Sequence, residues 1–316
     1  MTSKLLHKSN TLRGTIPINN SVVNYIFQQP TPSKTTASAT TASATTASAT
    51  TPSPTTPPIV LIGGTSQTIA SLLGHHTPLA NISGSGLLQY ELRGQGKTTT
   101  LPLDDCSLAR HVEDFDAVLD YHSDFTKDGK VDLCGFSFGG RVALAIAAER
   151  PHRIRKIVCT GVPADRGATG RLILKQWLRS LERGDLTNFI WQSISDGHSE
   201  RFLNRHESRL KDWVASAVAS NSAEAIHAIV GQTHTDDIEH PYHTINLAQK
   251  ALDNGLDQKD ALFLVGDQDR IASPKQCEIL ANLGHWKFDM IQGAGHSVPI
   301  EQPRLWRDAV KGHLGV

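Results

Sequence analysis

Cysteine is scarce in this chain, with only four residues in 316: Cys106, Cys134, Cys159 and Cys277. They are widely spaced and no two form a C-x-x-C pair, which argues against a disulfide framework and against a cysteine zinc site. Cys134 and Cys159 end apolar runs that are typical of buried strands. We therefore expect small core residues in a reducing compartment.

An excess of charge is also missing, because 31 Lys and Arg balance 31 Asp and Glu for a formal net charge of +0. Proteins that neutralise many phosphates carry a basic excess or a basic face. No basic cluster appears, so nucleic acid is not an expected partner. Long apolar runs are absent too: the longest, such as 142–148, fall far short of the roughly 18 residues of a membrane helix. No membrane span is expected.

Acidic residues are absent from the first 90 positions. An acid-free segment rich in Ser and Thr is typical of an organelle transit peptide. The alternative, which we favour, is a β-hairpin of the core within residues 1–30, because β-branched residues alternate over 15–18 and 22–27 around an Asn19-Asn20 turn. The expected location is the cytoplasm, with a plastid or mitochondrion as the alternative.

Large and charged side chains are nearly absent from residues 31–58, which contain three Thr-Thr-Ala-Ser-Ala repeats over 35–49 and several prolines. Such a segment buries too little apolar surface to offset the entropy lost on ordering. We therefore predict a disordered insertion between the second and third strands.

From residue 59 onward, short apolar runs alternate with helical patterns. Runs of this kind, separated by helices, predict an α/β fold with a mostly parallel central sheet covered on both faces. The expected strands lie at 59–62, 86–90, 131–134, 154–159, 261–265 and 287–291.

Helical patterns alone fill the middle of the chain and predict a helical lid at 163–258, inserted between core segments 59–162 and 259–316. The expected lid helices cover 171–183, 186–194, 200–219 and 223–231. The acidic stretch 236–241 has no spacing that converges on one ion, so we interpret it as a solvated turn and expect no metal.

One pentapeptide has the residue types of a catalytic turn: Gly135-Phe136-Ser137-Phe138-Gly139 fits the G-x-S-x-G nucleophile elbow. An apolar strand pattern runs directly into it and a small-residue helix pattern follows. A serine on a sharp strand-to-helix turn needs neighbours without bulky side chains, which Gly135 and Gly139 provide. The helix N-terminus then faces any negative charge that develops at Ser137.

Two later segments supply partners for this serine in the order Ser, acid, His. Asp267 and Asp269 follow the strand pattern 261–265, and His296 lies among small residues after 287–291. A serine needs a base within hydrogen-bond reach, and the base needs an orienting acid. Either aspartate satisfies the spacing.

These three segments together resemble the α/β-hydrolase superfamily, in its small single-lid branch that includes lactonases, esterases, cofactor-free haloperoxidases and the menaquinone-pathway lyase. The resemblance implies that Ser137 is the nucleophile, His296 the general base and Asp269 the acid, with Asp267 as the alternative. It implies no cofactor and a small-molecule substrate, and it leaves open whether the chain is a monomer or a homodimer.

The same resemblance implies an oxyanion hole formed by the backbone N–H groups of Phe138 and Thr65. Gly63-Gly64-Thr65 occupies the place of the family's His-Gly-x, so the histidine that normally holds this loop is missing. Likewise, residues 93–96 resemble the family's Arg-Gly-His-Gly turn with Gln95 in place of the histidine.

Substrate contacts are expected at Gly64, Ser66, Phe136, Arg141 and Val298. In the menaquinone-pathway lyase, which this chain resembles here, an arginine at the position of Arg141 helps bind a carboxylated substrate. A structural ion pair is the alternative role for Arg141.

The leading hypothesis is a serine hydrolase that cleaves a small ester, lactone or thioester through an acyl-enzyme. A lyase that uses the same triad for elimination or C–C bond cleavage on an anionic substrate is the second hypothesis. A hydrolase-like protein that only binds a ligand or partner is the third.

Overall fold

The computed structural model describes residues 10–31, 56–100, 103, 106–126, 129–232 and 237–315. Most of the insertion predicted to be disordered, together with Asp236, lies outside these residues. The strands are β1 (Thr11–Ile18), β2 (Ser21–Gln28), β3 (Ile59–Ile62), β4 (Leu87–Tyr90), β5 (Thr99–Thr100), β6 (Val131–Phe136), β7 (Ile154–Thr160), β8 (Ala261–Gly266) and β9 (Lys287–Ile291).

The α-helices of the described residues lie between and after these strands. They are α1 (His76–Ser83), α2 (Leu108–Tyr121), α3 (Phe138–Glu149), α4 (Ala168–Glu182), α5 (Leu186–Gly197), α6 (Glu200–His206), α7 (Leu210–Ala219), α8 (Ala223–Val230), α9 (Thr244–Asp253), α10 (Pro274–Leu283), α11 (Val298–Glu301) and α12 (Pro303–Leu314).

The strands form one sheet in the order β1-β2-β4-β3-β6-β7-β8-β9, with β5 paired to β2. All neighbours from β4 to β9 are parallel, whereas β1, β2 and β4 pair antiparallel. The predicted mostly parallel sheet is therefore confirmed. Parallel strands that end at one edge bring the loops after β3, β6, β8 and β9 together.

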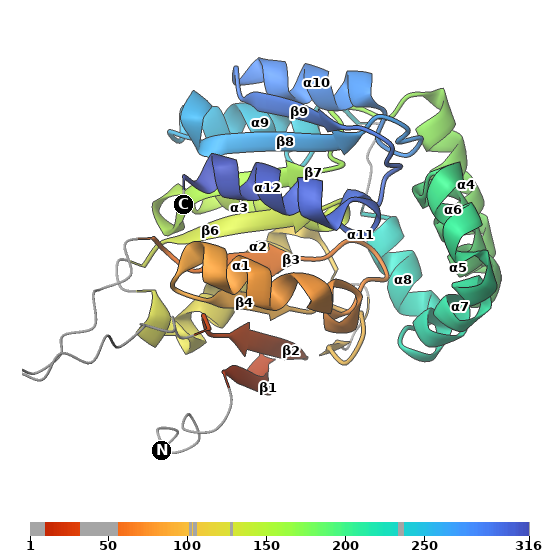
Figure 1. Ribbon diagram of the computed structural model, residues 1–316, viewed down its shortest axis with the longest axis horizontal. Coiled ribbons are helices and arrows are strands. Elements are labelled where there is room, and N and C mark those ends of the chain that lie inside the picture. The colour runs from red at the N-terminus through yellow and green to blue at the C-terminus, as the bar shows by residue number, and fades with distance from the viewer. Residues whose placement is uncertain are drawn as a thin grey trace, which may run out of the picture.

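Both faces of the central strands β3, β4, β6 and β8 are buried, as their continuous apolar sequences require. On β3, Ile59 and Leu61 face the core under α1 and α12, whereas Val60 and Ile62 face the core under α2 and α3. Figure 1 shows α1 and α12 in front of the sheet with α2 and α3 behind it. This two-sided burial gives the strand ends a rigid base.

At the N-terminal edge, β1 and β2 pair along their whole length, from Thr11 opposite Gln28 to Ile18 opposite Ser21. Their turn contains Asn19 in the left-handed region, at φ 51°. Asparagine tolerates this conformation better than most residues, which explains why the chain reverses here. The strands occupy the segment for which a hairpin was expected.

The helices α4 to α8, here called the inserted helices, follow β7 and stand together beyond one end of the sheet (Figure 1). One helix was expected over 200–219, but a 3₁₀ turn at Glu207–Arg209 separates α6 from α7. Helix α9 falls within the range expected for the lid, yet it packs on α3 and α10 of the core.

None of the helices in the described residues is both long and apolar enough to cross a membrane.

Candidate active site

Ser137 stands on the tight turn between β6 and α3. Its backbone has φ 54° and ψ −119°, a strained conformation for a residue with a side chain. The chain is crowded on both sides, because a Cβ on Gly135 would lie 2.4 Å from Gly139 O and a Cβ on Gly139 would lie 2.4 Å from Gly63 O. Glycine at both positions is thus required for the turn that presents the serine.

His296 connects the serine to an acid. Its Nε2 lies 2.8 Å from Ser137 Oγ, and its Nδ1 lies 2.7 Å from Asp269 Oδ2. Because a carboxylate only accepts, Nδ1 donates to Asp269 and Nε2 is the acceptor for the serine hydroxyl. The ring is 5% exposed and packs closely on Gly161, where a Cβ would come within 2.8 Å of His296 Cε1.

The two aspartates after β8 have different partners. Asp269 is buried, and its Oδ1 accepts hydrogen bonds from the backbone N–H groups of Ile271 and Ala272 at 2.9 and 2.8 Å. Those bonds orient its second oxygen toward His296. Asp267 instead accepts a hydrogen bond from the N–H of Ala294 at 3.1 Å. Of the two candidates, only Asp269 contacts the histidine.

The loop after β3 lies beside the serine. Gly64 is so close that a Cβ there would lie 3.1 Å from Ser137 Cβ. Gln67 holds the loop, because its Oε1 accepts the N–H of Gly64 at 2.8 Å and its own N–H donates to Gly64 O at 3.1 Å. The family pattern did not indicate this role for Gln67, which lies four residues after Gly63, the position of the family's histidine.

Two backbone N–H groups are free to donate at this point. Within the part of the chain that the structure describes, neither the N–H of Phe138 nor that of Thr65 donates to a protein acceptor. Phe138 is the first residue of α3, so its N–H has no acceptor within the helix. Both are the groups expected to form an oxyanion hole.

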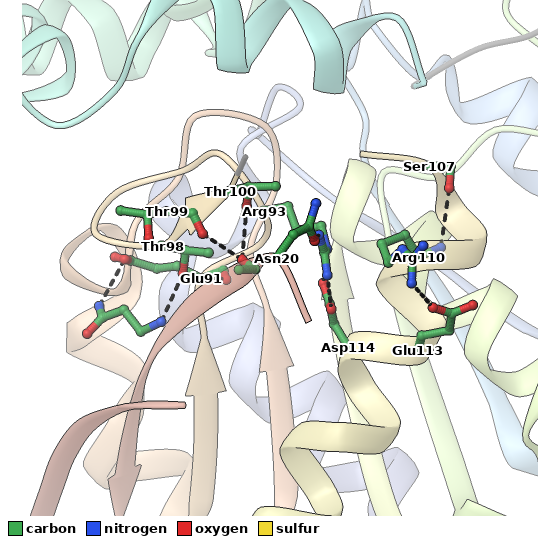
Figure 2. Close-up of polar contacts among 12 residues, drawn as sticks. Asn20, Glu91, Arg93, Thr98, Thr99, Thr100, Ser107, Arg110, Glu113 and Asp114 are labelled. Carbon is green, nitrogen blue, oxygen red and sulfur yellow. Dashed lines mark hydrogen bonds and ion pairs between the residues drawn. The ribbon is translucent and has the colours of Figure 1, made fainter. Parts of the chain in front are cut away.

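A buried ion pair holds the neighbouring loop after β4. Arg93 donates through Nε and Nη2 to both oxygens of Asp114 at 2.6 and 2.7 Å, and through Nη1 to Asn20 at 2.7 Å. Figure 2 shows Arg93 between Asn20 and Asp114. Glu91, two residues before Arg93, accepts a hydrogen bond from the backbone N–H of Lys97 at 2.7 Å. These bonds fix the 93–96 turn that the sequence singled out.

Ser137 and His296 open into a cavity of about 420 Å³ between the strand ends and the inserted helices. Apolar residues of α4 and α5 form one wall, including Trp177, Phe189 and Ile190. Segments 65–71 and 216–221 also line the cavity and bring mainly hydroxyl and amide groups to it. None of the described residues that line this cavity is Asp, Glu, Lys or Arg.

The residues expected to contact substrate lie in three different environments. Ser66 and Phe136 line the cavity, and Gly64 adjoins Ser137 as described above. Val298 is fully buried in the core under α12 and does not line the cavity. The expectation of a substrate contact at Val298 therefore has no support in its position.

Arg141 is directed away from the cavity. Its guanidinium donates to the backbone carbonyls of Gln232 and Tyr242, both at 2.7 Å, and lines a separate pocket. Burial, together with the charge of neighbouring Arg166, lowers the pKa of Arg141 to about 9. The expectation that Arg141 contacts an anionic substrate beside Ser137 is therefore wrong. Among the described residues, no carboxylate forms the alternative ion pair with it.

A contact that the sequence did not indicate joins the inserted helices to the loop of the histidine. Glu301 accepts the N–H of Gly295 through Oε1 and the N–H of Ser199 through Oε2, each at 2.9 Å. The hydroxyl of Ser199 donates to the same Oε2. No local signal pairs residues this far apart in the chain, although the acidic residue five positions after His296 was visible.

Comparisons with known proteins agree with this geometry. A family model described as "Alpha/beta hydrolase family" matches residues 59–309. No curated protein matches the chain. Among solved structures, similar chains include an alpha/beta hydrolase enzyme from a Medee basin deep-sea metagenome library, with TM-score 0.73, 17% identity and coverage of 96% of this chain and 98% of that chain.

Two further structures are similar at the same level. The enol-lactonase from Burkholderia xenovorans LB400 has TM-score 0.73 and 15% identity, with 96% of this chain and 100% of that chain covered. A thermophilic esterase from Thermogutta terrifontis has TM-score 0.69 and 18% identity, with 97% and 98% covered. At these identities the likeness establishes the fold.

Proposed function

Because the chain belongs to the alpha/beta hydrolase family, we propose that it is a serine hydrolase that cleaves a neutral carboxylic ester, lactone or thioester through an acyl-enzyme. The observation that carries the proposal is the continuous hydrogen-bond chain from Ser137 Oγ through His296 to Asp269, with distances of 2.8 and 2.7 Å. An activated serine at the base of a cavity is the arrangement that acyl transfer requires.

In the first step, Ser137 Oγ attacks the substrate carbonyl carbon while His296 Nε2 takes the hydroxyl proton. Asp269 keeps the Nδ1 proton in place and stabilises the imidazolium. The negative charge that develops on the carbonyl oxygen is stabilised by the N–H groups of Phe138 and Thr65 and by the N-terminus of α3. Return of the proton from His296 to the leaving oxygen or sulfur breaks the ester bond.

The second step regenerates the serine. A water molecule gives a proton to His296 Nε2 and attacks the acyl-enzyme, and the proton then passes to Ser137 Oγ as the acid leaves. Ser137 is only partly buried, so water reaches the acyl group through the cavity.

The neutral character of the substrate follows from the lining of the cavity. With no Asp, Glu, Lys or Arg among the described lining residues, a charged substrate would lose hydration without gaining a partner. The apolar wall with Trp177 and Phe189 fits an acyl chain or ring of moderate size. Since Arg141 lies in another pocket, the lyase hypothesis loses the feature that favoured it.

The test is the intact mass of the protein after exposure to a fluorophosphonate. We expect one adduct per chain on the wild type and none on Ser137→Ala, because only a serine activated by a base reacts at this rate. His296→Ala removes the base and should abolish labelling as well. Ser193→Ala, which changes another hydroxyl in the same cavity, should still be labelled.

Protein that has not been exposed to the fluorophosphonate is then assayed against esters, thioesters and lactones. A folded wild type that takes no label would contradict the acyl-enzyme, and a ligand-binding role would replace it. Labelling that persists in Ser137→Ala would place the reactive group elsewhere.

A further inference from the structure

His198, in the short link between α5 and α6, is held firmly beside the loop that follows β9. The N–H of Ser297 donates to Gly197 O at 2.9 Å, and the N–H of Ser199 donates to Glu301 at 2.9 Å. His198 lies between these two anchored residues. It is therefore fixed relative to the loop of the proposed catalytic histidine.

His198 lines the same cavity as Ser137. Its ring stacks on Phe202 with 5.0 Å between centroids and 15° between planes. Nδ1 lies 2.9 Å from Ile194 O, one turn earlier in α5. Packing and this hydrogen bond together hold the ring in one orientation.

The hydrogen bond also determines which nitrogen carries the proton. A carbonyl oxygen only accepts, so Nδ1 of His198 is the donor to Ile194 O, and in the neutral ring Nε2 is an acceptor. Nε2 has no hydrogen-bond partner in the described part of the chain. It is also not among the polar atoms sealed from solvent without a partner.

Burial favours the neutral form of this ring. Burial lowers the pKa of His198 below its ordinary value; the Ile194 carbonyl and Glu301 oppose this shift, and the rings of His296 and His206 reinforce it. The other polar side chains of the cavity are mainly hydroxyls and amides, which both donate and accept. A neutral imidazole with its proton on Nδ1 offers only an acceptor.

We propose that His198 Nε2 forms a subsite that accepts a hydrogen bond from a hydroxyl or amide N–H group on the substrate, so that the enzyme prefers neutral esters and lactones that carry such a donor. The reaction itself rests on the function proposed above. One neutral hydrogen bond in a partly desolvated site corresponds to a preference of roughly tenfold over the analogue without the donor.

The test compares γ-decalactone with α-hydroxy-γ-decalactone, which differ by one donor. We measure kcat/KM for both on the wild type and on His198→Phe, which keeps a flat ring on Phe202 and removes both nitrogens. His198→Gln offers a carbonyl oxygen near the position of Nε2. His206→Phe is the matched control, because His206 also contacts the ring of Phe202 but does not line the cavity.

We expect the wild type and His206→Phe to favour the hydroxylated lactone by about tenfold. The ratio should fall to near one in His198→Phe and recover in part in His198→Gln. A purely structural role of His198 would change both lactones together and leave the ratio unaltered, and that result overturns the subsite.

Binding of the same lactones to Ser137→Ala, measured by calorimetry with and without His198→Phe, separates the two proposals. If the hydroxylated lactone binds more tightly in a way that depends on His198, but the wild type hydrolyses neither lactone, the hydrolase proposal is contradicted and the subsite proposal stands. Turnover without a preference that depends on His198 contradicts the subsite and keeps the hydrolase. If neither lactone binds at millimolar concentration, the subsite is rejected.

Discussion

At the scale of single residues, Asp267 and Asp269 show how little separates a structural from a proposed catalytic group. Both follow β8, but Asp267 accepts a hydrogen bond from the N–H of Ala294, whereas Asp269 accepts hydrogen bonds from two loop N–H groups and from Nδ1–H of His296. The direction of one carboxylate relative to the ring decides which aspartate can orient the base.

Asp269→Asn is therefore expected to lower kcat for any ester that is turned over by roughly 10³- to 10⁴-fold, because the amide stabilises neither the correct tautomer nor the imidazolium. Asp267→Asn keeps an acceptor for Ala294 and should change kcat by less than about tenfold. Steady-state rates of the two purified variants measure this difference. Equal losses in both variants would refute the assignment of Asp269.

Asp132 on β6 provides a pH test away from the site. Burial raises its pKa to about 6, although hydrogen bonds and charge from Arg155 and the charge of Lys156 act in the opposite direction. An acid whose pKa is higher in the folded state binds protons more readily when folded. The protein therefore loses stability as the pH rises from the unfolded pKa of 3.8 through about 6.

Asp132→Asn removes this titration. The free energy of unfolding of the variant relative to the wild type should rise by roughly 2 kcal/mol between pH 4 and pH 7. Urea denaturation of both proteins at the two pH values gives this difference, and other carboxylates cancel in the comparison. A difference that is the same at both pH values would show that Arg155 compensates the burial.

At the scale of elements, the proposed site depends on contacts between the short helix α11 and the start of α6. Glu301, the last residue of α11, joins Gly295 before the histidine to Ser199 before α6. The inserted helices and the loop of His296 thus share one carboxylate. Movement of either segment breaks hydrogen bonds to the other.

Glu301→Gln replaces one acceptor oxygen by an N–H₂ group that cannot accept. We expect the free energy of unfolding to fall by about 1.5–3 kcal/mol and kcat to fall with it, because His296 loses its fixed backbone. Chemical denaturation and ester turnover are the measurements. Glu200→Gln, an exposed neighbour on α6 that contacts Asn204, should stay within about 0.5 kcal/mol of the wild type.

At the scale of the whole molecule, sheet order explains how the chain accommodates the repeat-rich insertion. Gln28 at the end of β2 and Ile59 at the start of β3 both lie opposite Leu87 of β4. Two strands on either side of a third are about 10 Å apart. A connection far shorter than residues 29–58 can span that gap.

Deletion of 35–49 halves this connection. We expect the free energy of unfolding to change by no more than about 1 kcal/mol, since each doubling of a flexible loop costs about 0.6 kcal/mol. Fluorophosphonate labelling should persist. A loss above about 2 kcal/mol would mean that the repeats contact the core and would contradict the predicted disordered insertion.

The sequence by itself predicted the fold together with Ser137 and His296, and it left Asp267 and Asp269 as alternatives for the acid. Strand periodicity predicts a parallel sheet because buried strands must be apolar on both faces, and Gly135 and Gly139 leave few turns other than the one that Ser137 occupies. These signals are local: each depends on a few neighbouring residues and on backbone sterics. They can therefore be read without knowing which distant residues pack nearby.

Only the tertiary structure decided what depends on distant segments. A substrate contact and a structural ion pair were the two roles expected of Arg141, yet its guanidinium donates to the backbone carbonyls of Gln232 and Tyr242, more than 90 positions away. His198 and Glu301 carried no motif, and their importance comes from packing of α5 and α6 against the loop after β9. A side chain's partner is set by long-range contacts, and one sequence records residue types without their neighbours in space.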